Sequence, residues 1–327
     1  MPRRLPIIAT VVAIAALALL AARPLRWEVD GLSMAPALLP GDVVASGVFP
    51  ALDRLRPRQR FERWIVRAPD GSDTIKRLVG LPGERIGIVA GDLVVDGARL
   101  LTPPDVLAQI ATPVAAVEER SLAGLIRLLV EGPILDDAAF APEERRLLLP
   151  VRDVGIAAIV TLKGRSATAA RVILSVDTRA VRFTPTASGQ FALVVGRLDG
   201  RFVATAWPLA PGANGGVSRR DALPGGAPHE WSVARPWPDC DAAPEDPPVL
   251  ECRLETDGTE AALTIDRLSV WRDVLQRPAA DGVSEWRLRP DALFVLGDFP
   301  SGSRDSRHWG PITAAHVVQR VVNFPTR

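Results

Sequence analysis

The sequence predicts a mostly β protein, with one membrane-spanning helix at its N-terminus and a β-rich (α+β) domain inserted into a β core. Three observations support this fold class: an uncharged apolar run at residues 5–22, short β-forming runs between Gly/Pro turns, and a change of composition at 101–267. We expect four segments: an anchor (1–24), the first part of the core (25–104), the insert (105–267), and the second part of the core (268–327).

The predicted anchor reads LPIIATVVAIAALALLAA, and its eighteen residues rise about 27 Å as a helix, close to the thickness of a bilayer core. Arg3 and Arg4 favour an N-terminus in the cytoplasm. We therefore expect a single-pass protein of the cytoplasmic (inner) cell membrane, with its body outside the cytoplasm and in contact with the lipid bilayer. The alternative is a cleaved signal peptide, because 16–18 (Ala-Leu-Ala) has the form of a cleavage site, but the apolar run continues beyond it.

Composition excludes some functions. A net charge of +1 gives no electrostatic reason to expect nucleic acid as a partner. Cys240 and Cys252 form no CxxC or Cys/His cluster, so we expect no zinc site. These two cysteines could form a disulfide outside the cytoplasm, and two unpaired thiols remain the alternative. The sequence does not indicate an oligomeric state.

The positive charges are almost all arginine. Of 39 Lys and Arg residues only Lys76 and Lys163 are lysine. Because this chain otherwise uses arginine where a positive charge is enough, each of the two lysines is a candidate for a chemical role.

Ser33 lies in a predicted loop. Residues 27–44 contain Gly and Pro between β-forming residues, which indicates a strand, a tight loop with Ser33, and a second strand that starts near Asp42. A loop serine without a partner is usually only a turn residue.

Lys76 is the candidate partner. Residues 74–79 alternate as a strand, so Lys76 shares a face with Leu78 while Arg77 points the other way. Burial on an apolar face lowers the pKa of a lysine, and a fall from about 10.4 to about 8 costs some 3 kcal/mol at neutral pH. A neutral amine can take a proton from a serine hydroxyl, whereas arginine does not deprotonate. A surface lysine at a strand end is the alternative.

A histidine base is the rival chemistry. The chain has three histidines, at 229, 308 and 316. His308 is close in sequence to Asp305 and Ser306, but the members of a catalytic triad usually come from separate segments.

Three blocks resemble the type I signal peptidase family, whose serine–lysine dyad lies on a mostly β core. The resemblance covers about residues 25–100 and 268–327. The blocks are Ser33-Met34-Ala35-Pro36 followed by Gly41-Asp42; Lys76-Arg77-Leu78-Val79-Gly80-Leu81-Pro82-Gly83-Glu84; and residues 296–310, LGDFPSGSRDSRHWG.

The resemblance implies a membrane-bound serine endopeptidase that cleaves signal peptides at Ala-x-Ala-like sites of secreted preproteins through an acyl-enzyme. Ser33 would be the nucleophile, its backbone N–H an oxyanion donor, and Lys76 the general base. This chemistry would require no metal and no organic cofactor. The supporting residues would be Ser303, which orients the amine, the ion pair of Asp305 and Arg307, and Asp298, which braces the last strand.

The sequence departs from the family in two places. Gly31 stands where some members carry a second oxyanion donor, and Phe299-Pro300 replaces more polar residues. A catalytically inactive, membrane-anchored binding protein, or another Ser–Lys peptidase with a specialised substrate, therefore remains an alternative.

The role of the insert is not apparent from the sequence. We expect helices near 106–117 and 121–130, and strands near 156–162, 171–176, 191–195, 201–207, 249–254 and 261–265, in a β-sandwich-like arrangement.

Overall fold

The computed structural model describes residues 25–47, 56–114, 117–122, 124–130, 132–136, 148–163, 170–185, 187–209, 230–237, 247–256, 262–278 and 281–323. The predicted membrane span lies outside these residues. Within them, no helix has the length and the apolar character needed to cross a membrane. The anchor therefore stays a prediction.

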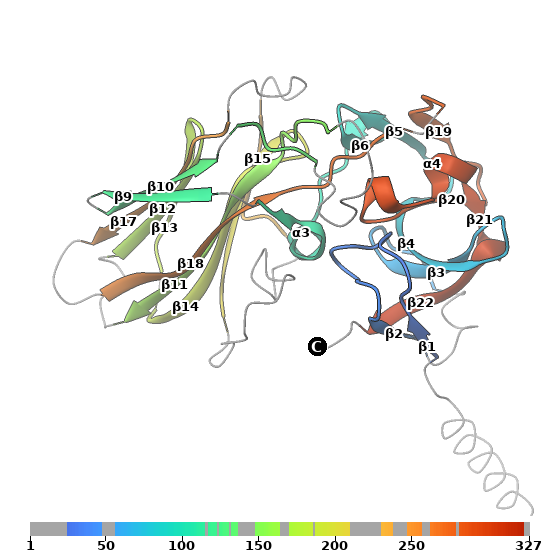
Figure 1. Ribbon diagram of the computed structural model, residues 1–327, viewed down its shortest axis with the longest axis horizontal. Coiled ribbons are helices and arrows are strands. Elements are labelled where there is room, and N and C mark those ends of the chain that lie inside the picture. The colour runs from blue at the N-terminus through green and yellow to red at the C-terminus, as the bar shows by residue number, and fades with distance from the viewer. Residues whose placement is uncertain are drawn as a thin grey trace, which may run out of the picture.

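One group of sheets, which we call the core part, combines strands from both ends of the chain (Figure 1). Its seven-stranded sheet has the order β1-β2-β22-β3-β4-β20-β21, and a four-stranded sheet has the order β19-β5-β6-β7. The strands are β1 (Arg26–Glu28), β2 (Val43–Ser46), β3 (Arg63–Arg67), β4 (Asp73–Gly80), β5 (Arg85–Val89), β6 (Asp92–Val95), β7 (Ala98–Arg99), β19 (Glu285–Arg287), β20 (Ala292–Leu296), β21 (Ile312–Thr313) and β22 (Val317–Asn323).

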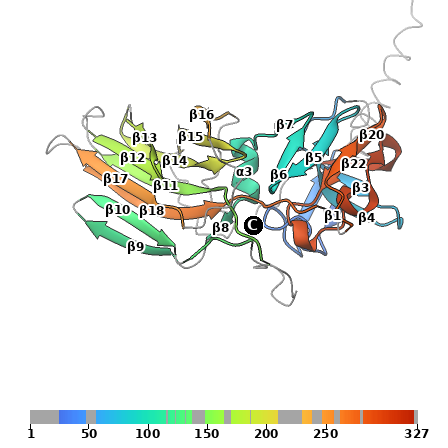
Figure 2. The ribbon, with the colours of Figure 1, turned by 90° about the horizontal axis from the view of Figure 1, so that it is seen from above.

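The second group, which we call the sandwich part, has two sheets that pack face to face (Figure 2). Their orders are β13-β12-β17-β10-β9 and β16-β15-β14-β11-β18-β8. The strands are β8 (Thr112–Pro113), β9 (Val117–Leu122), β10 (Leu125–Val130), β11 (Val154–Lys163), β12 (Ala170–Val176), β13 (Arg179–Phe183), β14 (Gly189–Leu198), β15 (Arg201–Pro208), β16 (Val233–Pro236), β17 (Leu250–Thr256) and β18 (Ala262–Arg272).

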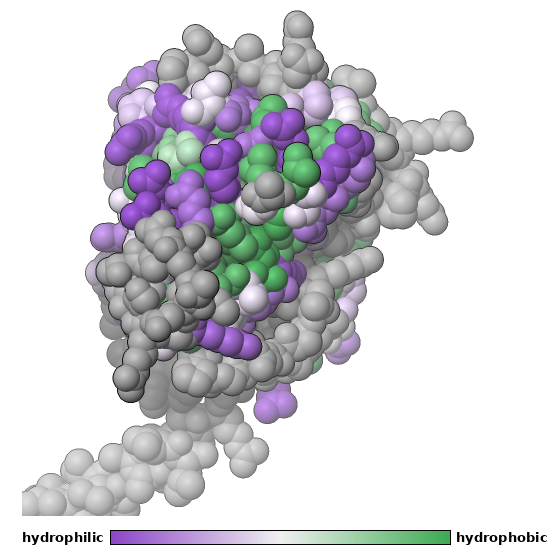
Figure 3. All heavy atoms as spheres, turned by 90° about the vertical axis from the view of Figure 1, so that its left-hand side faces the viewer, coloured by the Kyte–Doolittle hydropathy of each residue, from purple (hydrophilic) through white to green (hydrophobic). Residues whose placement is uncertain are grey.

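Alternation of apolar residues explains why the two sheets meet. In β12 the residues Val172, Leu174 and Val176 are buried while those between them are partly exposed, so one face is apolar. β11 and β14 present a matching face, and one hydrophobic core fills the space between the sheets. Seen from the far end of the sandwich part, hydrophobic residues show at the surface between hydrophilic ones (Figure 3).

The prediction of a mostly β protein is confirmed, and each of the six predicted strands of the insert overlaps one of β11, β12, β14, β15, β17 and β18. The helix predicted at 121–130 is wrong: these residues pair in the hairpin of β9 and β10, with Gly124 at a positive φ of 79° in the turn. The helix predicted at 106–117 is right only in its first part. It is α3 (Pro104–Ile110), and Pro113 then lies in an extended strand.

The chain passes from the core part into the sandwich part and returns to the core part at one place. β8 and β18 are antiparallel neighbours, with Thr112 opposite Arg272, so the two connections run side by side. β18 extends across the predicted boundary at 267/268.

Cys252 in β17 is a buried, free thiol, and burial raises its pKa to about 12. Cys240 lies outside the described residues.

The short helices belong to the connections. In the part of the chain that the structure describes, they are α3, α4 (Ser306–Trp309) and two 3₁₀ turns, η2 (Pro300–Gly302) and η3 (Ala314–His316). η2 and α4 follow β20 directly and carry the C-terminal sequence block.

Candidate active site

A loop connects β1 to β2 (Figure 1), and Ser33 lies within it, as predicted. The backbone closes the base of the loop, because Val29 N donates to Asp42 O and Gly41 N donates to Val29 O, both at 2.8 Å. Met34 and Leu38 are buried beneath the loop, so apolar packing holds the residues that follow the serine. The loop is therefore anchored on both sides of Ser33.

The two backbone groups of Ser33 differ in their contacts. Its carbonyl oxygen accepts a hydrogen bond from Phe299 N at 3.1 Å, which joins the loop to the C-terminal block. Its N–H donates to no other described residue. A donor with no internal acceptor, next to a candidate nucleophile, is available to an oxyanion.

Lys76 lies in the middle of β4, between β3 and β20, and only 1% of it is exposed. Burial lowers the pKa of Lys76 from 10.5 to about 8; the nearby carboxylates of Asp305 and Asp298 oppose this shift, and Arg307 adds to it. The amine makes no hydrogen bond or salt bridge with any residue in the described ranges. It is thus a buried base without a counter-ion in direct contact.

Ser33 and Lys76 line one cavity of about 520 Å³, together with Thr74, Arg304 and Trp309 among others. The structure has no hydrogen bond between the Ser33 hydroxyl and the Lys76 amine. Hydrogen bonds between catalytic groups are often long in a free enzyme and shorten when substrate binds. The two predicted residues therefore come together at one cavity.

Asp305 and Arg307 form the buried ion pair that the sequence predicts. Their side chains lie 2.6 Å apart and are 0% and 2% exposed. Burial acts to raise the pKa of Asp305, but the hydrogen bonds and the charge of Arg307, together with the N–H of Gly297, outweigh it and hold that pKa well below its usual range. Asp305 is therefore a fixed negative charge near the Lys76 amine.

We expected Ser303 to hydrogen-bond to the Lys76 amine, but the structure shows no such hydrogen bond. The Ser303 hydroxyl donates instead to Asp305 Oδ2 at 2.8 Å, and Gly297 N donates to the same oxygen at 3.0 Å. An ionised, buried carboxylate is a stronger acceptor than a neighbouring amine, which explains this choice.

Gly297 allows these elements to approach. A Cβ at this position would lie 2.2 Å from Ser303 Oγ and 2.4 Å from the Ser33 carbonyl oxygen, distances that no real side chain occupies. The absence of a side chain lets the backbone after β20 pack against the serine loop.

Asp298, predicted to brace the last strand, forms a buried bidentate pair with Arg77. Arg77 Nε and Nη2 donate to its two oxygens at 2.7 and 2.6 Å, and Arg77 Nη1 donates to Phe61 O at 2.9 Å. Arg77 points away from the face of Lys76, as its position in the strand predicts. Sequence reasoning did not identify Arg77 as the partner of Asp298, because 221 positions separate them.

The histidines in the described ranges lie apart from the cavity. His308 Nδ1 accepts from Asp305 N at 3.3 Å and so closes the first turn of α4, while His316 Nδ1 bonds to Thr313 Oγ1 at 3.0 Å. Neither ring is among the residues that line the cavity of Ser33 and Lys76. His229 is outside the described residues.

Comparison with known proteins agrees with the resemblance seen in the sequence. Residues 3–118 match a family model described as signal peptidase, peptidase S26. A 77-residue stretch is 32% identical to signal peptidase I V of Bacillus subtilis (strain 168). That match covers 24% of this chain and 45% of the Bacillus protein, so the similarity spans less than half of either.

Proposed function

From the confirmed resemblance to type I signal peptidases, we propose that the chain is a membrane-anchored serine endopeptidase that removes signal peptides from secreted precursors. The observation that carries this proposal is the buried Lys76 amine, which lines the same cavity as Ser33 and has a lowered pKa. Burial that lowers the pKa of a lysine to about 8 costs the fold stability, and such a cost is unusual for a lysine without a chemical role.

In the proposed mechanism the neutral Lys76 amine takes the proton of the Ser33 hydroxyl as Oγ attacks the scissile carbonyl carbon. The Ser33 N–H stabilises the oxyanion of the tetrahedral intermediate. When the C–N bond breaks, the ammonium of Lys76 returns the proton to the leaving amine, and the acyl group stays on Ser33. A water molecule, deprotonated by the same amine, then releases the acyl group and restores the hydroxyl.

The supporting residues have positioning roles in this proposal. The ion pair of Asp305 and Arg307 holds Ser303 and the Gly297 backbone, and Gly297 packs against the serine loop. Asp298 holds the side chain of Arg77, the residue that follows Lys76 in β4. The site thus depends on the register of β4 against β20.

The sheet offers an edge for an extended substrate. β20 pairs with β4 at Arg77, Leu78 and Gly80, whereas the preceding residues of β4, from Asp73, pair with β3 on the other side. The outer edge of β4 before Lys76 therefore has no neighbouring strand in the described structure, and Thr74 at this edge lines the cavity. A precursor could add a strand here by main-chain hydrogen bonds, with small side chains at Ala-x-Ala-like positions facing the site.

The anchor and topology belong to the same proposal. A helix at residues 5–22 would hold the core part at the outer face of the cytoplasmic membrane, because β1 begins at Arg26, directly after it. The nucleophile would then lie near the bilayer, where signal peptides end.

The test is the cleavage of a labelled preprotein by the purified full-length chain in detergent. Ser33→Ala and Lys76→Arg should each abolish cleavage, whereas Lys163→Arg, a matched change at an exposed lysine, should not. The kcat/KM of the native chain should rise with pH through about 8. Retention of the preprotein without cleavage would instead support an inactive binding protein, and a bell-shaped profile near pH 6.5 would indicate a histidine base.

A further inference from the structure

Arg304 lines the cavity of Ser33 and Lys76, and its charge has no role in the mechanism proposed above. The residue lies between η2 and α4. Its neighbours in the chain, Ser303 and Asp305, are 3% and 0% exposed, whereas Arg304 itself is exposed. Because buried hydrogen bonds fix both neighbours, the backbone holds Arg304 at the cavity.

The guanidinium of Arg304 has no acceptor. No hydrogen bond or ion pair joins it to another residue in the part of the chain that the structure describes. By contrast, Arg77 and Arg307 are each paired with a buried aspartate. A guanidinium offers five N–H donors and can bind a carboxylate through two hydrogen bonds at once. Arg304 therefore presents these donors to a ligand of the cavity.

Asp70, in the turn between β3 and β4, also lines the cavity but does not contact the guanidinium. Its Oδ1 accepts from Ser72 Oγ at 2.6 Å and from Ser72 N at 2.9 Å. These hydrogen bonds are the main reason why the pKa of Asp70 is lowered, and the charge of Arg304 is a smaller cause. The charge of Arg304 thus acts on Asp70 only from a distance, which leaves its donors for a ligand.

The cavity has room for more than the small side chains of an Ala-x-Ala-like site. Its volume is about 520 Å³, within the range of pockets that enclose a whole small-molecule ligand. Ala68, Pro69 and Trp309 form apolar parts of its lining. Beside such groups an ion pair is screened less than on an open surface, so a carboxylate in contact with Arg304 would be held more firmly.

The chemistry of a precursor limits which of its residues can bring a charge to Arg304. Side chains alternate along an added strand, so when the first and third residues before the cut face the site, the second faces away. Residues further upstream belong to the apolar segment of a signal peptide. A charged side chain in the cavity would therefore come from the residues after the cut, which become the start of the mature protein.

We propose that Arg304 selects precursors with an aspartate or glutamate among the first two residues of the mature protein. This inference rests on the proposed peptidase function and names the substrates that the site prefers. The guanidinium donates to that carboxylate while the small side chains before the cut lie next to Ser33 and Lys76. Arg304 is then a specificity-determining residue without a part in proton transfer, because arginine does not deprotonate.

The test compares labelled peptides that share one Ala-x-Ala site and carry Glu, Gln or Lys at one of the two positions after it. Fluorescence anisotropy measures their binding to full-length Ser33→Ala in detergent, and kcat/KM measures their cleavage by the native chain. At one or both positions the Glu peptide should bind and be cut about three- to tenfold better than the Gln peptide, with the Lys peptide last. About 0.5 M NaCl should reduce this difference.

Substitutions of Arg304 separate recognition from folding. Arg304→Gln should remove the preference for Glu over Gln. Arg304→Glu should invert the order in favour of the Lys peptide, a result that a merely structural role cannot produce. Arg182→Gln, an exposed change in β13, is the matched control and should keep the preference of the native chain.

The possible results distinguish this inference from the peptidase function. The inference is overturned if neither binding nor cleavage favours Glu, or if Arg304→Gln weakens all three peptides alike. Cleavage of all three peptides at equal rates would leave the peptidase function standing without the preference. A preference in binding without any cleavage would support the role of Arg304 and refute the peptidase function, and the absence of both binding and cleavage would refute both.

Discussion

Replacement of Lys76 by methionine should stabilise the protein while abolishing its activity. Burial holds the pKa of Lys76 at about 8 instead of 10.5, and the side chain is 1% exposed, so solvent screening is small. At pH 7 the native state must carry a buried ammonium, which costs about 3 kcal/mol. Methionine has a similar length and no charge, so Lys76→Met should gain up to this amount of unfolding free energy.

The gain should depend on pH in a defined direction. Between about pH 8 and 10.5 the unfolded chain retains the lysine proton and the native chain does not, so the stability of the native chain rises with pH. The advantage of Lys76→Met should therefore be complete below pH 8 and should vanish as pH approaches 10.5. Urea unfolding followed by tryptophan fluorescence, at pH 7, 9 and 10, measures this difference.

Lys163→Met is the matched control, because Lys163 is exposed at the end of β11. It should change the unfolding free energy by less than about 0.5 kcal/mol at every pH. Two results would refute this reasoning: a Lys76→Met variant that is less stable than the native chain at pH 7, or a stability difference that does not vary with pH. Either would mean that the Lys76 amine is not a buried base with a lowered pKa.

Three further changes test how the site is held together. Gly297→Ala places a methyl group within 2.4 Å of the Ser33 carbonyl oxygen and should lower kcat/KM on the order of 100-fold by shifting the serine loop; near-native kinetics would show that the loop tolerates the shift. Asp298→Asn leaves Arg77 as a buried, unpaired charge, so a calorimetric unfolding scan should show a loss of about 3–5 kcal/mol, and a loss below 1 kcal/mol would contradict this account. Gly31→Ser has open space around its Cβ and should leave Tm unchanged while raising kcat by up to about 100-fold; an unchanged kcat would mean that the new hydroxyl does not reach the oxyanion.

Local patterns in the sequence were sufficient for several features of the site. The Gly and Pro residues around Ser33 predicted its loop, and the alternation in residues 74–79 predicted that Lys76 and Arg77 face opposite ways. Strands with a strong apolar alternation, such as β12, were also found. These features depend on neighbours in the chain, which the sequence displays directly.

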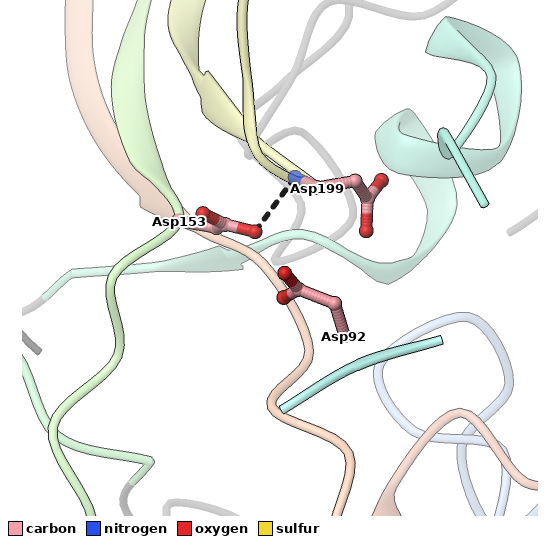
Figure 4. A group of neighbouring side chains, drawn as sticks. All are labelled: Asp92, Asp153 and Asp199. Carbon is pink, nitrogen blue, oxygen red and sulfur yellow. Dashed lines mark hydrogen bonds between the residues drawn. The ribbon is translucent and has the colours of Figure 1, made fainter. Parts of the chain in front are cut away.

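Features that depend on distant neighbours were missed. The hairpin of β9 and β10 resembles an amphipathic helix in composition, and only its pairing with β17 decides between the two. The carboxylates of Asp92, Asp153 and Asp199 lie close together although they come from three separate segments (Figure 4), and no local pattern in the sequence indicates this. The acceptor to which the Ser303 hydroxyl donates depends on the ionisation of Asp305, which cannot be read from the sequence.

The side-by-side connections at β8 and β18 bear on how the protein is made. Gly297 and Asp305, which hold the site, are synthesised after the whole sandwich part, so a nascent chain that has not reached them carries the serine and the lysine without the strand that aligns them. Pairing of Thr112 with Arg272 closes the intervening segment once the sandwich has folded, which shortens the effective loop between β4 and β20 and lowers its closure entropy. The proposed activity would then appear only once β20 has been made and has paired with β4, and the short effective loop would make that pairing fast.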